Sequence, residues 1–292
     1  AEGVWVVEGG MHRLAHAIAT LARHKGVDIR YNTHVDRIVT EHGRATAVEI
    51  DGTYRLEAEA ILYAGDPRAL ATGSMGTALK TVAPQTATLP RSFSARVHSF
   101  AATPQGVDLA HHNVFFAADP DSEFDDLAAG RIPTEPTLYL CAEDRGFGTP
   151  PPTVERFEII SNAPATDQEP PQQELNQWHH QIMQTMADMG VTFDPTPPPT
   201  SITTPAIFAD LFPETLGALY GQTPHGLTAS LQRPTATTPI ANLFLAGGGT
   251  HPGAGVPMAT LSARHAAEVI LHGPTSASMW AQTATPGGMS TG

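Results

Sequence analysis

The sequence predicts an α/β protein, and three observations lead to this fold class. Residues 1–66 have the apolar pattern of a helix followed by several strands. Residues 68–238 contain strand-like runs between proline-rich loops. They lack the regular alternation of strands and helices that forms parallel sheets, so they predict a mixed or antiparallel sheet. Near the C-terminus, an apolar strand, a glycine-rich turn and a helix follow one another.

The first region opens with a helix. Apolar side chains recur there at the spacing of one buried helical face, and Gly26 is expected to cap the helix end. Turns containing Gly43 and Gly52 separate the runs that follow, and the last run, before Gly65, is apolar enough for a strand buried on both faces. The helix and the four predicted strands are residues 11–25, 27–31, 35–39, 45–50 and 58–64.

The middle region holds four strand-like runs and one helix. The helix follows a pair of prolines, and Leu175, Trp178 and Ile182 begin its apolar face. Residues 194–200 contain four prolines and predict an irregular connector. The four strand-like runs are residues 92–101, 111–117, 137–142 and 156–162.

The C-terminal region contains the most informative pattern. A predicted strand, residues 240–246, leads through the glycine-rich turn 247–255 into a helix that starts at Pro257. Glycines let backbone amides approach a ligand, and a helix start presents free N–H groups, so the turn is a candidate site for an anion or a polar cofactor. It matches neither G-x-G-x-x-G nor a P-loop, and a tight corner without a ligand is the alternative. Residues 274–292 are expected to be a disordered tail.

Charge and composition exclude several classes of protein. Lys plus Arg is 16 and Asp plus Glu is 29, and the formal charge of −13 disfavours a nucleic-acid backbone as the main partner. Cys141 is the sole cysteine, which excludes an intrachain disulfide and a cysteine-rich zinc site. No apolar run in the sequence is long enough to span a bilayer.

No metal site is expected from the sequence. Residues 119–130 begin like an EF-hand loop, but Phe124 and Gly130 stand where that loop requires Gly and Glu, so a solvated acidic loop is expected. Two pairs of adjacent histidines occur at 111–112 and 179–180. Adjacent side chains diverge in a strand and in a helix, which disfavours a shared ion.

A long motif surrounds the C-terminal turn, residues 242–258, with the sequence NLFLAGGGTHPGAGVPM. It resembles the phytoene desaturase family of FAD-dependent carotenoid desaturases. Shorter motifs with the same resemblance are residues 8–11, 35–38, 65–67, 211–215, 217–221 and 233–234. Residues 106–116 and 257–262 are most similar to bacterial members that make the 3,4 double bond of acyclic hydroxy- or methoxycarotenoids.

The resemblance covers nearly the whole chain and implies a two-domain flavoprotein of the amine oxidase type. A partial Rossmann-like FAD-binding domain would comprise residues 1–67 and 239–273, with a mixed-sheet α+β substrate domain, residues 68–238, inserted between them. The family's G-x-G-x-x-G unit precedes the part of the pattern that this chain matches. The chain is therefore expected to be a C-terminal fragment.

The resemblance also implies which residues lie by FAD. The glycine turn would pass the flavin and its phosphate–ribityl arm, and the helix start would stabilise negative charge on the reduced ring. Val35 would meet the adenine end and Asp66 would end the strand beside the cofactor, although ordinary strand and turn roles remain the alternative for both. The implied FAD-binding residues are Val35, Asp66, Gly247, Gly248, Gly249, Thr250, Gly255, Val256, Pro257 and Met258.

The implied activity is FAD-dependent carotenoid desaturation, the removal of two hydrogens from adjacent carbons of a long polyene. Such a substrate is bound by apolar burial, and its lipid environment implies a cytoplasmic protein attached peripherally to the membrane surface. No catalytic residue is identified, because Arg145, Glu143 and His98 fit structural or solvated roles better. The electron acceptor stays open. The alternatives are a polyene isomerase or saturase, a flavin amine oxidase, or a non-catalytic fragment that binds a carotenoid or prenyl chain.

Overall fold

The computed structural model describes residues 5–223 and 232–273, which belong to two compact units. Unit 1 contains the chain up to residue 32 and residues 93–210, and unit 2 contains residues 33–92 and the chain from residue 211. The sequence predicted domain boundaries at 67/68 and 238/239. The chain instead passes between the compact units at 32/33, 92/93 and 210/211. The assignment of cofactor and substrate binding to domains stays a prediction, and the expected tail lies outside the described residues.

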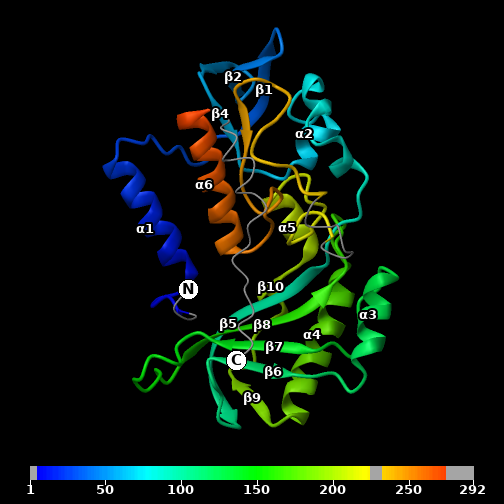
Figure 1. The fold of residues 1–292 in the computed structure, drawn as a ribbon. Helices are drawn as coiled ribbons and strands as arrows, with labels where there is room; N and C mark the ends of the chain where they lie inside the picture. Colours follow the sequence, from blue (N-terminus) through cyan, green and yellow to red (C-terminus); the bar gives the residue numbers. More distant parts are fainter. Residues whose placement is uncertain (1–4, 224–231, 274–292) are drawn as a thin grey trace, which may run out of the picture. The chain divides into compact units, whose positions relative to one another are not determined.

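An antiparallel sheet forms the centre of unit 1 (Figure 1). The strand order is β10-β5-β8-β7-β6, and β9 also pairs with β5. All of these pairings are antiparallel, which decides between the mixed and antiparallel alternatives. The four predicted runs are confirmed as β5 to β8, whereas β9 and β10 were not predicted. The strands are β5 Ser94–Gly106, β6 His112–Phe115, β7 Leu138–Ala142, β8 Glu155–Ala163, β9 Val191–Asp194 and β10 Ile202–Thr203.

Helix α4, Gln172–Asp188, packs its apolar face against this sheet and confirms the predicted helix. Its residues Ile182 and Met186 are fully buried among strand residues such as Phe157 and Ile159. The core of unit 1 therefore lies between α4 and the sheet. Two short helical segments, η3 Pro199–Ser201 and α5 Pro205–Leu211, follow in the chain.

The acidic stretch after β6 is a helix, not the solvated loop that we predicted. Helix α3, Pro120–Ala128, begins after Asp119, whose carboxylate accepts hydrogen bonds from the backbone N–H groups of Asp121 and Ser122. Acidic side chains near a helix N-terminus interact favourably with its dipole, and proline is well tolerated in the first turn. The clustered carboxylates therefore stabilise a helix start.

The N-terminal helix is confirmed, but its surroundings differ from the prediction. Helix α1, Met11–His24, ends in a Schellman arrangement in which Gly26 donates to Arg23 and Val27 donates to Ala22. None of its residues is buried, so the predicted burial of its apolar face is wrong in the described structure. The strand predicted at 27–31 is absent as well, because this segment forms no ladder with another described strand.

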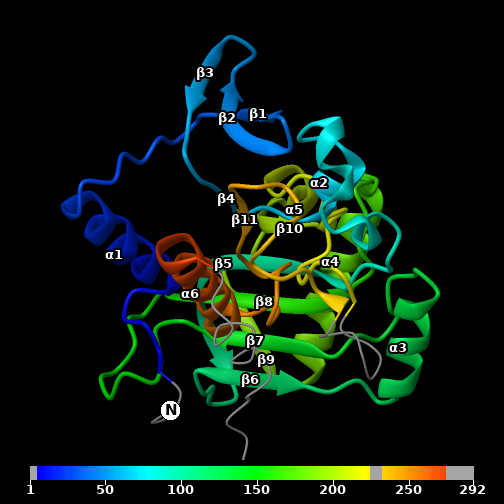
Figure 2. The same cartoon turned by 45° about the horizontal axis from the view of Figure 1, so that its top comes forward.

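Unit 2 contains two small sheets and several helical segments. The antiparallel sheet β1-β2-β3 is turned at His42 and Gly43 and again at Asp51 and Gly52, all with positive φ, as the predicted turns require (Figure 2). A parallel pair joins β4 to β11. The elements are β1 Val35–Glu41, β2 Arg44–Ile50, β3 Tyr54–Glu57, β4 Ile61–Tyr63, α2 Arg68–Thr72, η1 Thr77–Thr81, η2 Pro84–Ala87, β11 Leu243–Leu245 and α6 Val256–His272.

The predicted strand 58–64 is real but shorter, and it is not buried on both faces. Ile61 is buried, whereas Leu62, which points to the opposite face of the strand, is 44% exposed. Ile61 and Leu245 join a core that also contains Ile38 and Leu70. The strand, turn and helix predicted at the C-terminus are all present, as β11, residues 247–255 and α6.

Candidate cofactor site at the glycine turn

The glycine turn lies in unit 2 between β11 and α6. β11 runs parallel to β4, so the turn follows directly on a paired strand and stands beside the residues that end β4. The Ser262 hydroxyl, on α6, accepts a hydrogen bond from the Gly247 N–H at 2.8 Å and lies 2.7 Å from the Ala259 carbonyl. Ser262 therefore fixes the helix to the start of the turn.

Two glycines of the turn are explained by packing inside unit 2. A Cβ on Gly249 would lie 2.5 Å from the Cδ atom of Pro67. Gly247 has φ +104°, and a Cβ there would lie 3.0 Å from the Ala64 carbonyl oxygen. Both positions bring the turn against the end of β4, so their glycines are needed even without a ligand.

Gly255 differs from these two. Its φ is +95°, and a Cβ there would meet nothing within 4 Å. It precedes α6, whose first turn has no side-chain cap and includes the exposed residues Val256 and Met258. Their backbone N–H groups have no partner within the helix, while Pro257 has no N–H group. An anionic or polar group could therefore approach this helix start.

The buried side chain of Arg233 is hydrogen-bonded to the glycine turn. Its guanidinium donates to the carbonyl oxygens of Gly248 at 2.6 Å, Tyr220 at 2.9 Å and Gln222 at 3.1 Å. The side chain is 6% exposed, and this burial lowers the pKa of Arg233, while the charge of Asp66 opposes that shift. Only the arginine and proline at 233–234 hint at this role in the sequence, and the three carbonyl partners could not be predicted from it.

Asp66 follows β4 in the chain, and its carboxylate makes two structural interactions. Its place beside FAD stays a prediction. It accepts a hydrogen bond from the Arg68 N–H at 2.9 Å, and it forms a buried ion pair with Arg91. A second ion pair joins Arg68 to Glu214. Burial, with further effects from Asp66 and Glu214, raises the pKa of Tyr63, so its phenol stays protonated. Asp66 thus fixes the end of β4, and Arg91 is a residue that sequence reasoning missed.

Thr250 contributes a buried hydroxyl to the turn. It is 0% exposed, yet its hydroxyl oxygen has no hydrogen-bond partner among the described residues. A buried hydroxyl without a partner is costly, so a polar group from outside the chain would stabilise it. The free helix start and this hydroxyl fit a cofactor that carries phosphate and ribityl groups.

Val35 stands at the start of β1, half-buried, and pairs with Ile50 of β2. It lies in unit 2 with the turn, on the other sheet. Its contact with the adenine end of FAD stays a prediction.

The three side chains weighed as catalytic groups lie in unit 1. Arg145 forms a bidentate ion pair with Glu155, at 2.7 and 2.9 Å, and donates to the Leu109 carbonyl at 2.6 Å. His98 is completely buried, and desolvation lowers its pKa to about 4. These contacts and this burial indicate structural roles for Arg145 and His98. An oxygen of Glu143 lies 3.9 Å from the Cys141 sulfur.

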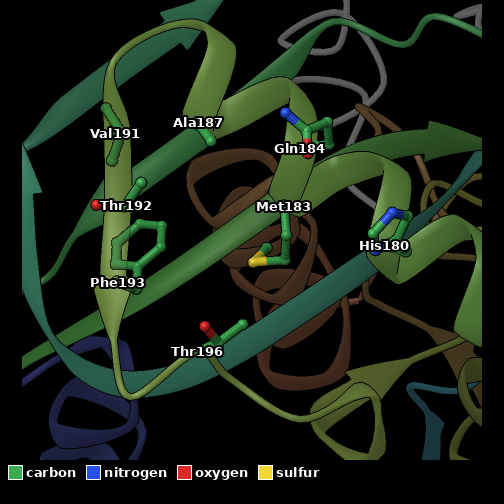
Figure 3. Close-up of a pocket in the computed structure, with 8 residues that line it drawn as sticks. All are labelled: His180, Met183, Gln184, Ala187, Val191, Thr192, Phe193 and Thr196. Atoms are coloured by element: carbon green, nitrogen blue, oxygen red, sulfur yellow. The ribbon is translucent and has the colours of Figure 1, made fainter.

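A shallow cavity of about 180 Å³ lies between α4 and β9 of unit 1 (Figure 3). Met183 and Phe193 give it an apolar wall, with Thr196 at one side and His180 at one end. It contains none of the predicted site residues and is too small for a long polyene. The glycine turn remains the candidate site.

Comparisons with known proteins identify the family of this chain. A family model described as flavin containing amine oxidoreductase matches residues 1–271. A hydroxyneurosporene desaturase of Cereibacter sphaeroides is 51% identical over 93% of this chain and 54% of its own length. One of Rhodobacter capsulatus is 48% identical over 92% of this chain and 54% of its own length. The chain thus spans about half the length of these curated relatives.

Among solved structures, an oxidoreductase from Methanosarcina mazei has a TM-score of 0.52 at 14% identity, covering 89% of this chain and 54% of that one. A likeness at this identity supports the fold alone. Among the described residues, no helix is long and apolar enough to cross a membrane.

Proposed function

The chain belongs to the flavin-containing amine oxidoreductase family, and on that premise we propose that it is part of an FAD-dependent carotenoid desaturase. The observation that carries this proposal is its identity of 51% and 48% to two hydroxyneurosporene desaturases over more than nine-tenths of the chain. The predicted α/β fold of the amine oxidase type is consistent with the family match and with the solved neighbour.

In this proposal, FAD lies against the glycine turn. The Thr250 hydroxyl would gain its missing partner from the cofactor, and the backbone N–H groups of Val256 and Met258 would face its negatively charged part. Arg233 would hold the Gly248 peptide in place. When bound, FAD supplies the two-electron acceptor for hydride.

The proposed substrate is an acyclic hydroxy- or methoxycarotenoid, and the proposed reaction makes the C3–C4 double bond. The names of the two relatives support this substrate class. A long polyene offers almost no polar handle, so burial of its apolar surface, at about 25 cal/mol per Å², would supply most of the binding energy. Because such a molecule is dissolved in lipid, we further propose a cytoplasmic protein that binds the membrane surface peripherally.

The test is product analysis of the gene product that contains this chain. It would be expressed in cells that accumulate 1-hydroxyneurosporene, and the carotenoids would be separated and their absorption spectra recorded. We expect one additional conjugated double bond and a yellow, flavin-containing purified protein. A flavoprotein that changes only cis and trans geometry would instead indicate an isomerase. A protein that lacks flavin, binds the carotenoid and leaves it unchanged would overturn the proposal in favour of a carrier.

A further inference from the structure

A cluster of metal-ligating side chains lies at the edge of the sheet in unit 1, and none of its residues belongs to the glycine turn of unit 2. His112 begins β6 and is paired with Cys141 of β7, so both side chains stand on the same face of the ladder. His111 immediately precedes the strand, and its ring meets that of His112 at a centroid distance of 4.4 Å. One ligand atom from each of these three residues lies within 4.8 Å of the others.

His111 points one ring nitrogen at a backbone carbonyl and the other at the Cys141 sulfur. Its Nδ1 atom lies 2.7 Å from the Arg145 carbonyl oxygen. A carbonyl only accepts, so Nδ1 carries the proton and Nε2 carries the lone pair. Nε2 is 3.7 Å from the Cys141 sulfur. Metal-bound histidines characteristically donate their other N–H group to a carbonyl or carboxylate, as His111 does here.

The carbonyl that orients His111 is itself held in place. The Arg145 side chain is fixed by its two hydrogen bonds to Glu155, which is 3% exposed. On the other side of the cluster, the Tyr139 hydroxyl lies 2.6 Å from Nδ1 of His112. Both imidazoles are thus oriented by groups behind them.

The distances suit a tetrahedral ion. Zinc binds thiolate sulfur at about 2.3 Å and imidazole nitrogen at about 2.0 to 2.1 Å, which places two such ligands about 3.5 Å apart. The observed separation of 3.7 Å between Cys141 and His111 is close to this value. An oxygen of Glu143 lies 3.9 Å from the sulfur, but Glu143 is outside the group whose ligand atoms all lie within 4.8 Å of one another, so water would take the fourth position. His112 belongs to that group and is exposed.

We propose that Cys141, His111 and His112 form a binding site for one thiophilic divalent cation, with water in the fourth position, and Zn²⁺ matches this ligand set. Binding forms a bond between the sulfur and the ion, and the thiol proton leaves to solvent. The sequence-based expectation of no metal weighed only residues adjacent in the chain, and it could not include Cys141, which cross-strand pairing supplies.

The experiment uses the purified chain, stripped with a chelator and titrated with Co²⁺ as a spectroscopic stand-in for Zn²⁺. We expect one equivalent of Co²⁺ to produce the near-ultraviolet charge-transfer band of a cobalt–thiolate bond, and Zn²⁺ to displace it. Zn²⁺ should also protect Cys141, the sole cysteine, from a thiol-specific alkylating reagent.

Variants separate a site from a mere hydrogen-bonded pair. Cys141→Ser should abolish the band. His112→Gln changes an exposed side chain and should weaken Co²⁺ binding by more than the roughly 10- to 100-fold typical of an outer partner, whereas Tyr139→Phe should fall within that range. His180→Gln, on the exposed side of α4, is the matched control and should keep full affinity.

The proposal is overturned if Co²⁺ gives no thiolate band, or if His112→Gln binds it as tightly as the parent chain. Neither readout depends on flavin, so this test fails or succeeds independently of the proposed function.

Discussion

Replacing Thr250 by valine tests the glycine turn most directly. The Thr250 hydroxyl is completely buried and has no partner among the described residues, and a buried hydroxyl without a partner costs about 1 to 3 kcal/mol. Valine has nearly the same shape and no hydroxyl. We therefore expect Thr250→Val to leave the free energy of unfolding unchanged or to raise it by about 1 kcal/mol. If FAD supplies the missing partner, the loss of one neutral hydrogen bond of about 1 kcal/mol should weaken flavin binding about fivefold.

Thr86 offers a matched control in the same unit. It is 3% exposed, and its hydroxyl donates to the Ala83 carbonyl at 2.8 Å. Thr86→Val should lower the free energy of unfolding by about 1 kcal/mol and leave flavin affinity unchanged. Stability would be measured by urea unfolding followed by circular dichroism, and affinity by flavin titration of the gene product that contains this chain. The reasoning fails if Thr250→Val is as destabilising as Thr86→Val, or if it binds flavin as tightly as the parent.

Three further changes test other parts of the structure. Gly249→Ala should destabilise unit 2, because its Cβ would lie 2.5 Å from Pro67, whereas Gly248→Ala, with its nearest neighbour at 3.6 Å, should fold normally in the same thermal melt. Ile182→Ala should cost about 2 to 5 kcal/mol in urea unfolding, because Ile182 is 0% exposed in the core of unit 1, and a cost below 1 kcal/mol would contradict this packing. His98 has a folded-state pKa of about 4 against an ordinary 6.5, so the unfolded chain takes up a proton that the folded chain refuses, and stability should fall by up to about 3 kcal/mol as the pH drops from 7 to 4. His98→Gln should flatten this slope, and an equal slope in both proteins would assign the effect to other groups.

The sequence predicted those elements whose pattern is local. Helix α4 repeats its apolar residues at helical spacing, and the strands β5 to β8 are continuous runs bounded by turns, so both could be recognised without knowledge of their partners. Helix α3 was missed because its acidic residues act through the helix start, which a count of charges does not reveal. The prediction of a strand at 27–31 was wrong for the opposite reason. A β-branched run becomes a strand only when another strand pairs with it.

The candidate site was predictable to a similar extent. The glycine turn and Asp66 follow from a contiguous motif and a strand end. The Arg233 contacts could not be predicted, because its three carbonyl partners lie elsewhere in the chain and nothing in their side chains marks them. The pairing of Cys141 with His112 depends on the register of β6 and β7, which could not be read from the sequence.

The division of each unit into two separate chain segments has a consequence for biosynthesis. β4 leaves the ribosome well before β11, its only described partner strand. Until β11 is made, the apolar residues around Ile61 have an incomplete core, and exposed apolar surface of this kind is prone to aggregation. A nonsense mutation shortly before Leu243 would therefore spare the whole sheet of unit 1, yet leave unit 2 unable to close its core.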